Sequence, residues 1–575
     1  MAPNSQPVPP APQPGSVSTE INAGRGDRFL KFAVAACFLV VLASYVWVIS
    51  PRFSIGNPSI IDDWSALDNA PNALSKLAQL AYDPAEVGDP QRYRPSFLAV
   101  WNDLQWHTLG APRHLLGPNL WNLLRLAIFI GALMLVPVMV LKRRMATDLD
   151  KLKLAVFSAA LPLAIISTPL IGEDFARFGP GEPTLVSGMI LGGFLLGAAV
   201  RRVIAGRARG HWRARLTTAA MFAGGYLLWL LGVYHKESSV CFLAMAPFIY
   251  LYLNRRWREE RLIDRALLQY RSAQLTAGAM LIPVLHMAYE VKLIADGGKT
   301  VYGGVVPQGT GGLAQKLQDS VQAMNHAMNA SLGTAVWHWI MLSLPVLIVA
   351  VALRNKRIPW LAIALTAGGA AAFAFQGLAG ITQSRYYIPS LALFGVAFVL
   401  LTVRLRAGLV GFVIICAALF TLNFVDGSRG NVSKRAKDDR EGGAAINALA
   451  AINPWRCQTL IGGMEQEPAD AFPVLVDSRE RPASDDCDGG TKYLVGRTNA
   501  ALVSPVTNDR VFNICVNDWR PIFQNGTWTI WRCKQFKAGR MGGQAIPHII
   551  EESRFVPGVR WTDRHTRLYG KLNAG

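Results

Sequence analysis

The stretch 29-FLKFAVAACFLVVLASYVWVI-49 decides the fold class of this 575-residue chain. It is about 20 residues long, which is the length a helix needs to cross a bilayer. It is too long for the core of a secretory signal, and no small-residue cleavage site follows it. We therefore expect a retained first membrane span. The preceding residues 1–28 are rich in Pro and Ser, and we expect them to form a disordered cytoplasmic tail.

The composition points to a protein that is mostly embedded in a membrane. Hydrophobic residues make up 51% of the chain and charged residues only 17%, against about a quarter in an ordinary soluble domain. Lys and Arg outnumber Asp and Glu by 58 to 38, giving a formal charge of +20. These basic residues stand in short clusters between apolar runs, as the positive-inside rule requires, so we expect no nucleic-acid partner.

Further apolar runs predict about 11 membrane-spanning helices in all. The sixth run is short for the thickness of the hydrocarbon layer. The sequence thus predicts an α-helical polytopic membrane protein, with spans at residues 29–49, 120–141, 152–172, 184–204, 216–234, 238–253, 268–291, 334–353, 358–379, 386–403 and 405–422.

The basic clusters also predict the orientation. They precede span 1 and follow spans 2, 4, 6, 8 and 10, so all lie on one side if the N-terminus is cytoplasmic. An odd number of spans then places residues 423–575 outside the cell membrane, which we take to be a bacterial inner or plasma membrane. Four cysteines in that tail predict two disulfides with three possible pairings: Cys457, Cys487, Cys515 and Cys533.

The sequence pattern of the tail is typical of a small soluble domain. Short apolar or alternating runs such as 492-KYLVGR-497 and 527-TWTIWRCK-534 are bounded by Gly, Pro, Asn and Asp. This pattern predicts strands, so we expect an extracytoplasmic domain that is mixed α/β or β-rich.

The first outer loop, residues 50–119, is the longest loop between predicted spans. It contains 59-SIIDDWSALDNA-70, in which Asp62 and Asp63 follow the first span closely. Its second half, 88-GDPQRYRPSFLAVWNDLQWHTLG-110, has apolar residues at helical spacing and suits a helix lying along the membrane surface.

Other outward segments also carry unusual polar groups. They are 172-GEDFARFGPGEP-183, 234-YHKESS-239 and 380-GITQSRYY-387. Acids and bases therefore gather at one membrane face, beside helix ends. We expect a cavity there that holds an anionic lipid headgroup.

Transfer of a group from a lipid phosphate needs such an arrangement. Cations must hold the phosphate, and Lys236, Arg385, Arg92 and Arg94 can supply them, with His235 and Tyr386 as hydrogen-bond donors. A carboxylate must take the proton from the acceptor hydroxyl, and Asp62 and Asp63 are the candidates.

The motifs IIDDW, RYRP, YHKES and QSRYYIP, with the long first outer loop and the many spans, resemble the GT-C integral-membrane glycosyltransferases that use polyprenyl-phosphate sugars. The resemblance covers residues 29–422. The arabinofuranosyltransferases with a soluble tail have a similar layout.

The resemblance implies an inverting glycosyltransferase acting on the extracytoplasmic face, with a glycan, lipid or protein acceptor. Asp62 or Asp63 would be the base, and we favour Asp62. Lys236 and Arg385 would hold the donor phosphate. Glu173 and Asp174 would match a second acidic loop, which in some members of the class binds a divalent cation and in others contacts the acceptor, and Glu237 would belong to the same acceptor side.

Plainer interpretations stay open for several of these residues. Lys236 and Glu237 could be an ion pair at a helical hairpin, and Arg385 with Tyr386 could anchor a span at the interface. The arginines of RYRP could bind ordinary anionic membrane lipids. Alternative functions are a transporter or flippase of a lipid-linked glycan, another membrane transferase, or a polysaccharide ligase.

Overall fold

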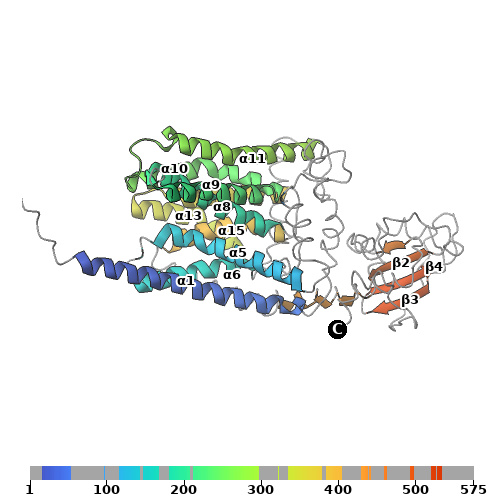
Figure 1. Ribbon diagram of the computed structural model, residues 1–575. Coiled ribbons are helices and arrows are strands. Elements are labelled where there is room, and N and C mark those ends of the chain that lie inside the picture. The colour runs from blue at the N-terminus through green and yellow to red at the C-terminus, as the bar shows by residue number, and fades with distance from the viewer. Residues whose placement is uncertain are drawn as a thin grey trace, which may run out of the picture.

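The chain is described from a computed structural model, shown in Figure 1. The structure describes residues 16–53, 96, 116–142, 145, 147–166, 181–207, 211–296, 322, 335–378 and 384–403, ten positions between 429 and 444, and strands at 459–462, 492–497, 520–525 and 528–533.

A bundle of long helices makes up most of the described residues (Figure 1). Successive helices run in opposite directions, so each end of the bundle contains the start of one helix and the end of the next. We call the end at which α1 begins the near end, and the opposite end the far end. The helices are α1 (Ser16–Phe53), α5 (Leu116–Leu141), α6 (Asp148–Ile166), α8 (Glu182–Ile204), α9 (Trp212–Val233), α10 (Ala246–Glu259), α11 (Arg271–Asp296), α13 (Ala335–Asn355), α14 (Trp360–Leu378) and α15 (Ile388–Thr402).

Within the described residues, six helical segments are long and apolar enough to cross a membrane. The first apolar segment starts at Arg28, although α1 itself begins at Ser16, inside the segment expected to be a tail. The prediction of a mostly helical fold is therefore confirmed, with six candidate membrane spans. The six segments are Arg28–Pro51, Asn122–Leu141, Glu182–Ile204, Trp212–Val233, Trp360–Gly377 and Arg385–Thr402.

Ten of the predicted spans overlap described helices, and the last, at 405–422, lies outside the described residues. The total of 11 spans stays a prediction. The sixth predicted span, 238–253, is not one α-helix. It consists of a 3₁₀ helix, η5 (Glu237–Met245), followed by α10. Pro247 in the first turn of α10 explains the junction, because proline cannot donate the backbone hydrogen bond that would continue a helix through it.

Helices α8 and α9 approach each other through glycines. A Cβ atom on Gly188 would lie 2.8 Å from the backbone nitrogen of Gly232, and one on Gly192 would lie 2.6 Å from that of Trp229. Only residues without a side chain allow backbones to come this close, as in the small-residue interfaces of membrane helices. The α8–α9 pair is therefore fixed by the two glycines one turn apart in 188-GMILG-192.

Helix α15 is the centre of the bundle. Of the segment Arg385–Thr402, 94% is buried, and α15 packs against α5, α6, α8, α13 and α14. Its sequence is apolar on every side, as expected for a helix surrounded by other helices. A short 3₁₀ helix, η7 (Ser384–Tyr387), leads into it at the far end.

The C-terminal part of the chain contains a four-stranded sheet, which lies beyond the far end of the bundle (Figure 1). The strand order is β1-β2-β4-β3, with β1 and β2 parallel and the other pairs antiparallel. Two predicted strand runs coincide with β2 and β4. The bounds are β1 (Thr459–Gly462), β2 (Lys492–Arg497), β3 (Arg520–Asn525) and β4 (Trp528–Cys533).

The location of this sheet outside the cell and its disulfides stay predictions. The described part of the chain contains two free cysteines, Cys37 and Cys241, both in the helical region. Of the four tail cysteines, Cys533 falls in a described strand, and Cys457, Cys487 and Cys515 lie outside the described residues.

Candidate functional site

A group of polar residues lies at the far end of the bundle, where α8 and α15 begin and α9 ends. We call it the far-end cluster and define it as Glu182, His235, Lys236, Tyr386 and Arg385. Glu182 is in the first turn of α8, and His235 and Lys236 connect α9 to η5. Arg385 and Tyr386 belong to η7, directly before α15. Three connections far apart in the sequence thus supply one cluster.

The centre of the cluster is a buried ion pair. Lys236 Nζ lies 2.8 Å from Glu182 Oε1, and the exposed fractions of the two side chains are 9% and 0%. A charged side chain is stable in the interior only with a close partner, so each of the two holds the other in place. The first turn of α8 also suits Glu182, because the positive end of the helix dipole favours an acid there.

Two cations lie close to the ring of Tyr386. Lys236 Nζ is 4.3 Å from the ring centre, and the guanidinium carbon of Arg385 is 4.9 Å from it. Arg385 Nη2 also donates a hydrogen bond of 3.2 Å to the Tyr386 hydroxyl. The aromatic face attracts both cations, so Tyr386 keeps two like charges close together.

His235 is fully buried and lies beside Gly181, the residue directly before α8. A Cβ atom on Gly181 would lie 2.7 Å from His235 Cδ2, so the glycine makes room for the imidazole. The residue after the ion-paired lysine, Glu237, is also buried. Both residues therefore lie within the polar interior of the far end and not on its surface.

Three buried hydroxyls close to the cluster have no hydrogen-bond partner among the described residues. Ser238 and Ser239 follow Lys236 in η5, and Ser390 lies in the first turn of α15. Leaving a buried polar group without a partner costs about 1–3 kcal/mol. The second carboxylate oxygen of Glu182, Oε2, is also buried without a hydrogen-bond partner among the described residues. Such groups indicate that a polar molecule, ligand or water, belongs there.

A second set of polar contacts runs along the neighbouring helix α11. The Tyr234 hydroxyl lies 3.2 Å from His286 Nδ1, and His286 Nε2 lies 3.3 Å from Glu290 Oε1. Tyr234 directly precedes His235, so these residues extend the far-end cluster towards α11. Ionisable residues inside a membrane bundle are usually functional.

The first outer loop also reaches this end of the bundle. Ser96 Oγ donates a hydrogen bond of 3.2 Å to the backbone oxygen of Leu230, in the last turns of α9. Ser96 directly follows the predicted RYRP motif. The loop that carries the candidate base therefore returns to the part of α9 that leads into His235.

The structure brings together the predicted site residues that it describes. Lys236, Arg385 and Tyr386 are in contact, and His235 and Glu237 flank Lys236 in the chain. The other predicted residues, Asp62, Asp63, Arg92, Arg94, Glu173 and Asp174, lie outside the described residues. Among the residues that are described, no group of three or more His, Cys, Asp or Glu side chains could hold a metal ion.

Sequence reasoning missed Glu182 and the three serines. Glu182 stands in the quoted segment GEDFARFGPGEP, of which only Glu173 and Asp174 match the second acidic loop that the resemblance implies. An available signal was the Glu-Pro pair at the start of an apolar run, which is typical of the first turn of a helix. The serines carried no pattern of their own.

Two solved structures resemble the chain in fold. Both are crystal structures of ArnT from Cupriavidus metallidurans, one bound to undecaprenyl phosphate and one in the apo state. The first has a TM-score of 0.43 and 13% sequence identity, and covers 87% of this chain and 97% of the ArnT chain. The second has a TM-score of 0.42 and 13% identity, with 87% and 98% covered.

No family model and no curated protein matches the chain. With TM-scores below 0.5, the likeness is too loose to transfer the role of any ArnT residue to this chain.

Proposed function

We propose that the chain is an inverting glycosyltransferase that moves a sugar from a polyprenyl-phosphate donor to a glycan, lipid or protein acceptor on the extracytoplasmic face of the membrane. The observation that supports this most directly is the far-end cluster. There a buried lysine, fixed by Glu182, and an arginine lie on the same tyrosine ring at one end of a membrane bundle.

Lys236 and Arg385 would hold the donor phosphate. An ammonium group has three donors, and the ion pair with Glu182 orients Lys236 without using all of them. Arginine binds phosphate oxygens with two parallel hydrogen bonds. The site lies at the end of apolar helices, which suits a donor whose headgroup is charged and whose long tail stays in the bilayer.

Two further features favour an anion at this place. The N-termini of α8 and α15 both lie here, and the positive ends of helix dipoles attract negative charge. The buried hydroxyls of Ser238, Ser239 and Ser390 could donate hydrogen bonds to a phosphate or to sugar hydroxyls. A bound donor would thus supply the partners that these groups lack among the described residues.

The chemical step requires a base near the acceptor. We assign this role to Asp62 or Asp63, with Asp62 preferred, in the loop whose Ser96 contacts the end of α9. The carboxylate would take the proton from the acceptor hydroxyl while the acceptor oxygen attacks the anomeric carbon. The bond from that carbon to the phosphate oxygen breaks, and polyprenyl phosphate leaves with the electron pair.

The cations then have a second role, since negative charge develops on the leaving phosphate in the transition state. Lys236 and Arg385 would stabilise it, with Arg92 and Arg94 as further cations from the first loop. His235 would donate a hydrogen bond at the same place. We assign Glu173, Asp174 and Glu237 to the acceptor side. If the reaction uses a divalent cation, Glu173 and Asp174 would be its ligands.

The test is sugar transfer by the purified full-length protein from a panel of synthetic polyprenyl-phosphate sugars, with donor binding measured separately. Asp62→Asn or Asp63→Asn should abolish transfer while donor binding persists. Lys236→Met should weaken donor binding about tenfold or more, because a charge-assisted hydrogen bond is lost. Lys292→Met is the matched control, because Lys292 is an exposed lysine on α11.

Each result has a clear meaning. Undiminished transfer by both aspartate variants would remove the proposed base. Donor binding without any transfer by the wild-type protein would favour a transporter or flippase of the lipid-linked sugar. Equal donor binding by Lys236→Met and Lys292→Met would exclude the far-end cluster as the phosphate site.

A further inference from the structure

A cavity of about 550 Å³ opens at the near end of the bundle, opposite the far-end cluster. We call it the near-end cavity. The last turn of α10 and the residue after it supply Arg255, Arg256, Glu259 and Glu260, and the connection from α13 to α14 supplies Arg357. This cavity has no part in the glycosyl transfer proposed above, because the helices separate it from the far end.

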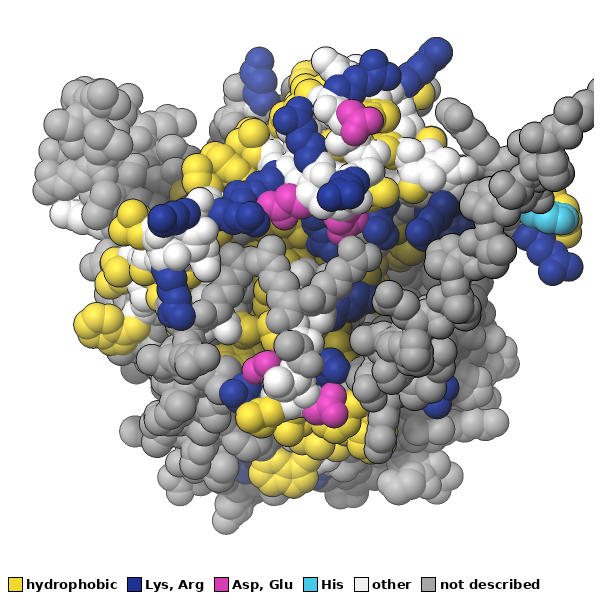
Figure 2. All heavy atoms as spheres, turned by 90° about the vertical axis from the view of Figure 1, so that its left-hand side faces the viewer, with side chains coloured by type: hydrophobic (Ala, Val, Ile, Leu, Met, Phe, Trp, Pro, Cys, Tyr) yellow, Lys and Arg dark blue, Asp and Glu magenta, His cyan; other side chains and the backbone are white. Residues whose placement is uncertain are grey.

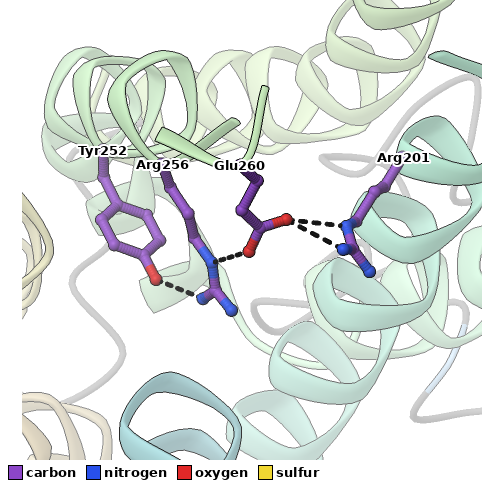
Figure 3. A network of polar contacts seen from close by, with 4 residues as sticks. All are labelled: Arg201, Tyr252, Arg256 and Glu260. Atoms are coloured by element: carbon purple, nitrogen blue, oxygen red, sulfur yellow. Dashed lines mark hydrogen bonds and ion pairs between the residues drawn. The ribbon is translucent and has the colours of Figure 1, made fainter. Parts of the chain in front are cut away.

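Figure 3 shows how one carboxylate fixes two arginines. Glu260 Oε2 accepts a hydrogen bond of 3.1 Å from Arg201 Nε on α8 and forms an ion pair of 2.9 Å with Arg201 Nη2. Glu260 Oε1 lies 3.4 Å from Arg256 Nε, and Arg256 Nη1 donates a hydrogen bond of 2.5 Å to the Tyr252 hydroxyl. The Arg256 guanidinium is thus held from two sides at the edge of the cavity.

The carboxylate of Glu259 likewise binds two arginines. Glu259 Oε1 accepts a hydrogen bond of 3.0 Å from Arg255 Nε and another of 3.3 Å from Arg357 Nη1. Arg255 Nη1 also donates a hydrogen bond to the backbone oxygen of Ile358. Four arginines therefore share two glutamates, and three of the four, Arg255, Arg256 and Arg357, line the cavity. The lining thus has an excess of one positive charge, and Arg201 adds another to the network.

The arginines keep donors available for a ligand. A guanidinium has five N–H groups. In the hydrogen bonds among the described residues, Arg255 and Arg256 each use two of them and Arg357 uses one. Held by carboxylates, tyrosine and backbone, these planar groups are preorganised for the bidentate binding that phosphate oxygens favour.

Part of the cavity wall is apolar. It is formed by Trp360 and Leu361 at the start of α14 and by Leu400 and Leu401 at the end of α15. The Trp360 ring is fixed by stacking on Phe248 of α10, with 6.4 Å between the ring centres. One cavity is thus lined by both cations and hydrocarbon side chains, at the end of the bundle, where the helices of a membrane protein meet the lipid headgroups.

The surface around the cavity is also positively charged. Figure 2 views the near end and shows that Lys and Arg side chains gather there, with few Asp and Glu among them. The orientation predicted from the sequence directs this end towards the cytoplasm, where the membrane leaflet carries anionic lipids. Scattered basic residues would be enough for orientation, whereas paired guanidiniums around a cavity form a binding site.

We propose that the near-end cavity binds the phosphate of an anionic phospholipid, with the arginines on the headgroup and the lipid backbone against the apolar wall. The phosphate is the shared chemistry of a lipid headgroup and a soluble phosphate ester. The apolar wall favours the lipid, because a fully hydrated ion gains nothing from leucine and tryptophan side chains.

The experiment uses the delipidated full-length protein and native mass spectrometry with phosphatidylglycerol, cardiolipin, phosphatidylcholine and soluble glycerol 3-phosphate. We expect one or two tightly retained anionic lipids and about tenfold weaker retention in the double variant Arg255→Gln with Arg357→Gln. Arg357→Gln alone is a milder variant, since the Arg357 side chain is 63% exposed and its loss is compatible with folding. Arg258→Gln is the matched control, because Arg258 is exposed on the same helix and does not line the cavity.

Weaker retention in both cavity variants, with wild-type behaviour of Arg258→Gln, would support the proposal. Equal retention by the wild type and both cavity variants would overturn it. So would equal retention of phosphatidylcholine. Competition by glycerol 3-phosphate at the concentration of the lipid would also contradict it, because the cavity would then be a site for a soluble phosphate ester.

Discussion

Lys236 and Glu182 form an ion pair of 2.8 Å inside the bundle, between the start of η5 and the first turn of α8. The pair connects two helical segments that are not neighbours in the sequence. It also fixes the ammonium group beside Tyr386, 4.3 Å from the ring centre. One interaction therefore contributes both to the packing of the far end and to the position of the cation assigned to the donor phosphate.

Glu182→Gln should destabilise the protein and weaken donor binding together. The substitution keeps the size of the side chain but leaves the Lys236 ammonium buried without its anion. Removing one partner of a buried ion pair costs about 3–5 kcal/mol in the free energy of unfolding. Denaturation in detergent measures this loss, and the variant Glu182→Gln with Lys236→Met should recover part of it, because the unpaired charge is gone.

The control for this prediction is a surface ion pair. Asp148 and Lys151 are 3.2 Å apart on α6, and the Asp148 side chain is 65% exposed. Asp148→Asn should change the free energy of unfolding by less than about 1 kcal/mol, because exposed pairs contribute little. If Glu182→Gln had an equally small effect, the buried pair would have no structural role.

Two adjacent glycines in α8 should respond in opposite ways to the same substitution. A Cβ atom on Gly192 would meet the backbone of α9 at 2.6 Å, whereas one on Gly193 would meet nothing within 4 Å. Gly192→Ala should therefore force α8 and α9 apart and lower the free energy of unfolding by about 1–3 kcal/mol. Gly193→Ala should raise it by up to about 1 kcal/mol, because alanine favours the helix.

Thermal unfolding in detergent compares these two variants directly. Equal melting temperatures would mean that the close approach of α8 and α9 does not limit stability. Gly188→Ala, which faces the backbone of Gly232, should behave like Gly192→Ala.

Much of the helical region could be predicted because membrane helices depend on a local property. A run of about 20 apolar residues must form a helix in a bilayer, whatever the rest of the chain does. The runs 120–141 and 184–204 therefore coincide closely with helices α5 and α8, and the run 29–49 lies within α1, which begins earlier, at Ser16. The division of the sixth run into η5 and α10 could have been found from Pro247.

The strands of the tail were partly predictable for a similar reason. The alternating runs KYLVGR and TWTIWRCK correctly predicted β2 and β4, but no predicted run corresponds to β3. The pair Asn525–Gly526, which begins with the last residue of β3, is a strong hairpin signal, and β3 and β4 are indeed antiparallel neighbours. Pro521 obscured the pattern, although proline is acceptable in β3 because this strand is at the edge of the sheet.

The contacts of the site could not be predicted from the sequence. The acid closest to Lys236 in the sequence is Glu237, but the ion pair is with Glu182 on another helix. Which acid a lysine contacts depends on how two packed helices are rotated and shifted along each other. A single sequence does not specify this arrangement. The close approach of α8 and α9, by contrast, had a local signal in GMILG that was not used.

Tyr386 should be needed for its ring more than for its hydroxyl. Tyr386→Phe keeps the aromatic face that lies on Lys236 and Arg385 and removes the hydroxyl that accepts from Arg385 Nη2. We expect donor affinity within about threefold of the wild type for Tyr386→Phe, and about tenfold lower for Tyr386→Leu, because a cation on an aromatic ring contributes about 0.5–2 kcal/mol. Donor titration measures both, and equal losses in the two variants would assign the effect to the hydroxyl.

Gly181→Ala should disturb the site through His235. The added Cβ would lie 2.7 Å from His235 Cδ2, and the ring is fully buried, so it cannot turn into solvent to avoid the contact. Misplacing a group that contacts the donor by about 1 Å can lower the transfer rate by up to about 100-fold. We expect a clear loss of transfer with a smaller loss of stability.

A double-variant comparison separates this effect from general damage to the fold. His235→Ala removes the ring that the new Cβ would meet, so adding Gly181→Ala to His235→Ala should change transfer little further. Transfer rates of the four proteins give the coupling between the two positions. Additive losses would contradict the proposed contact, and Gly278→Ala, whose Cβ would meet nothing within 4 Å, controls for the introduction of alanine into a membrane helix.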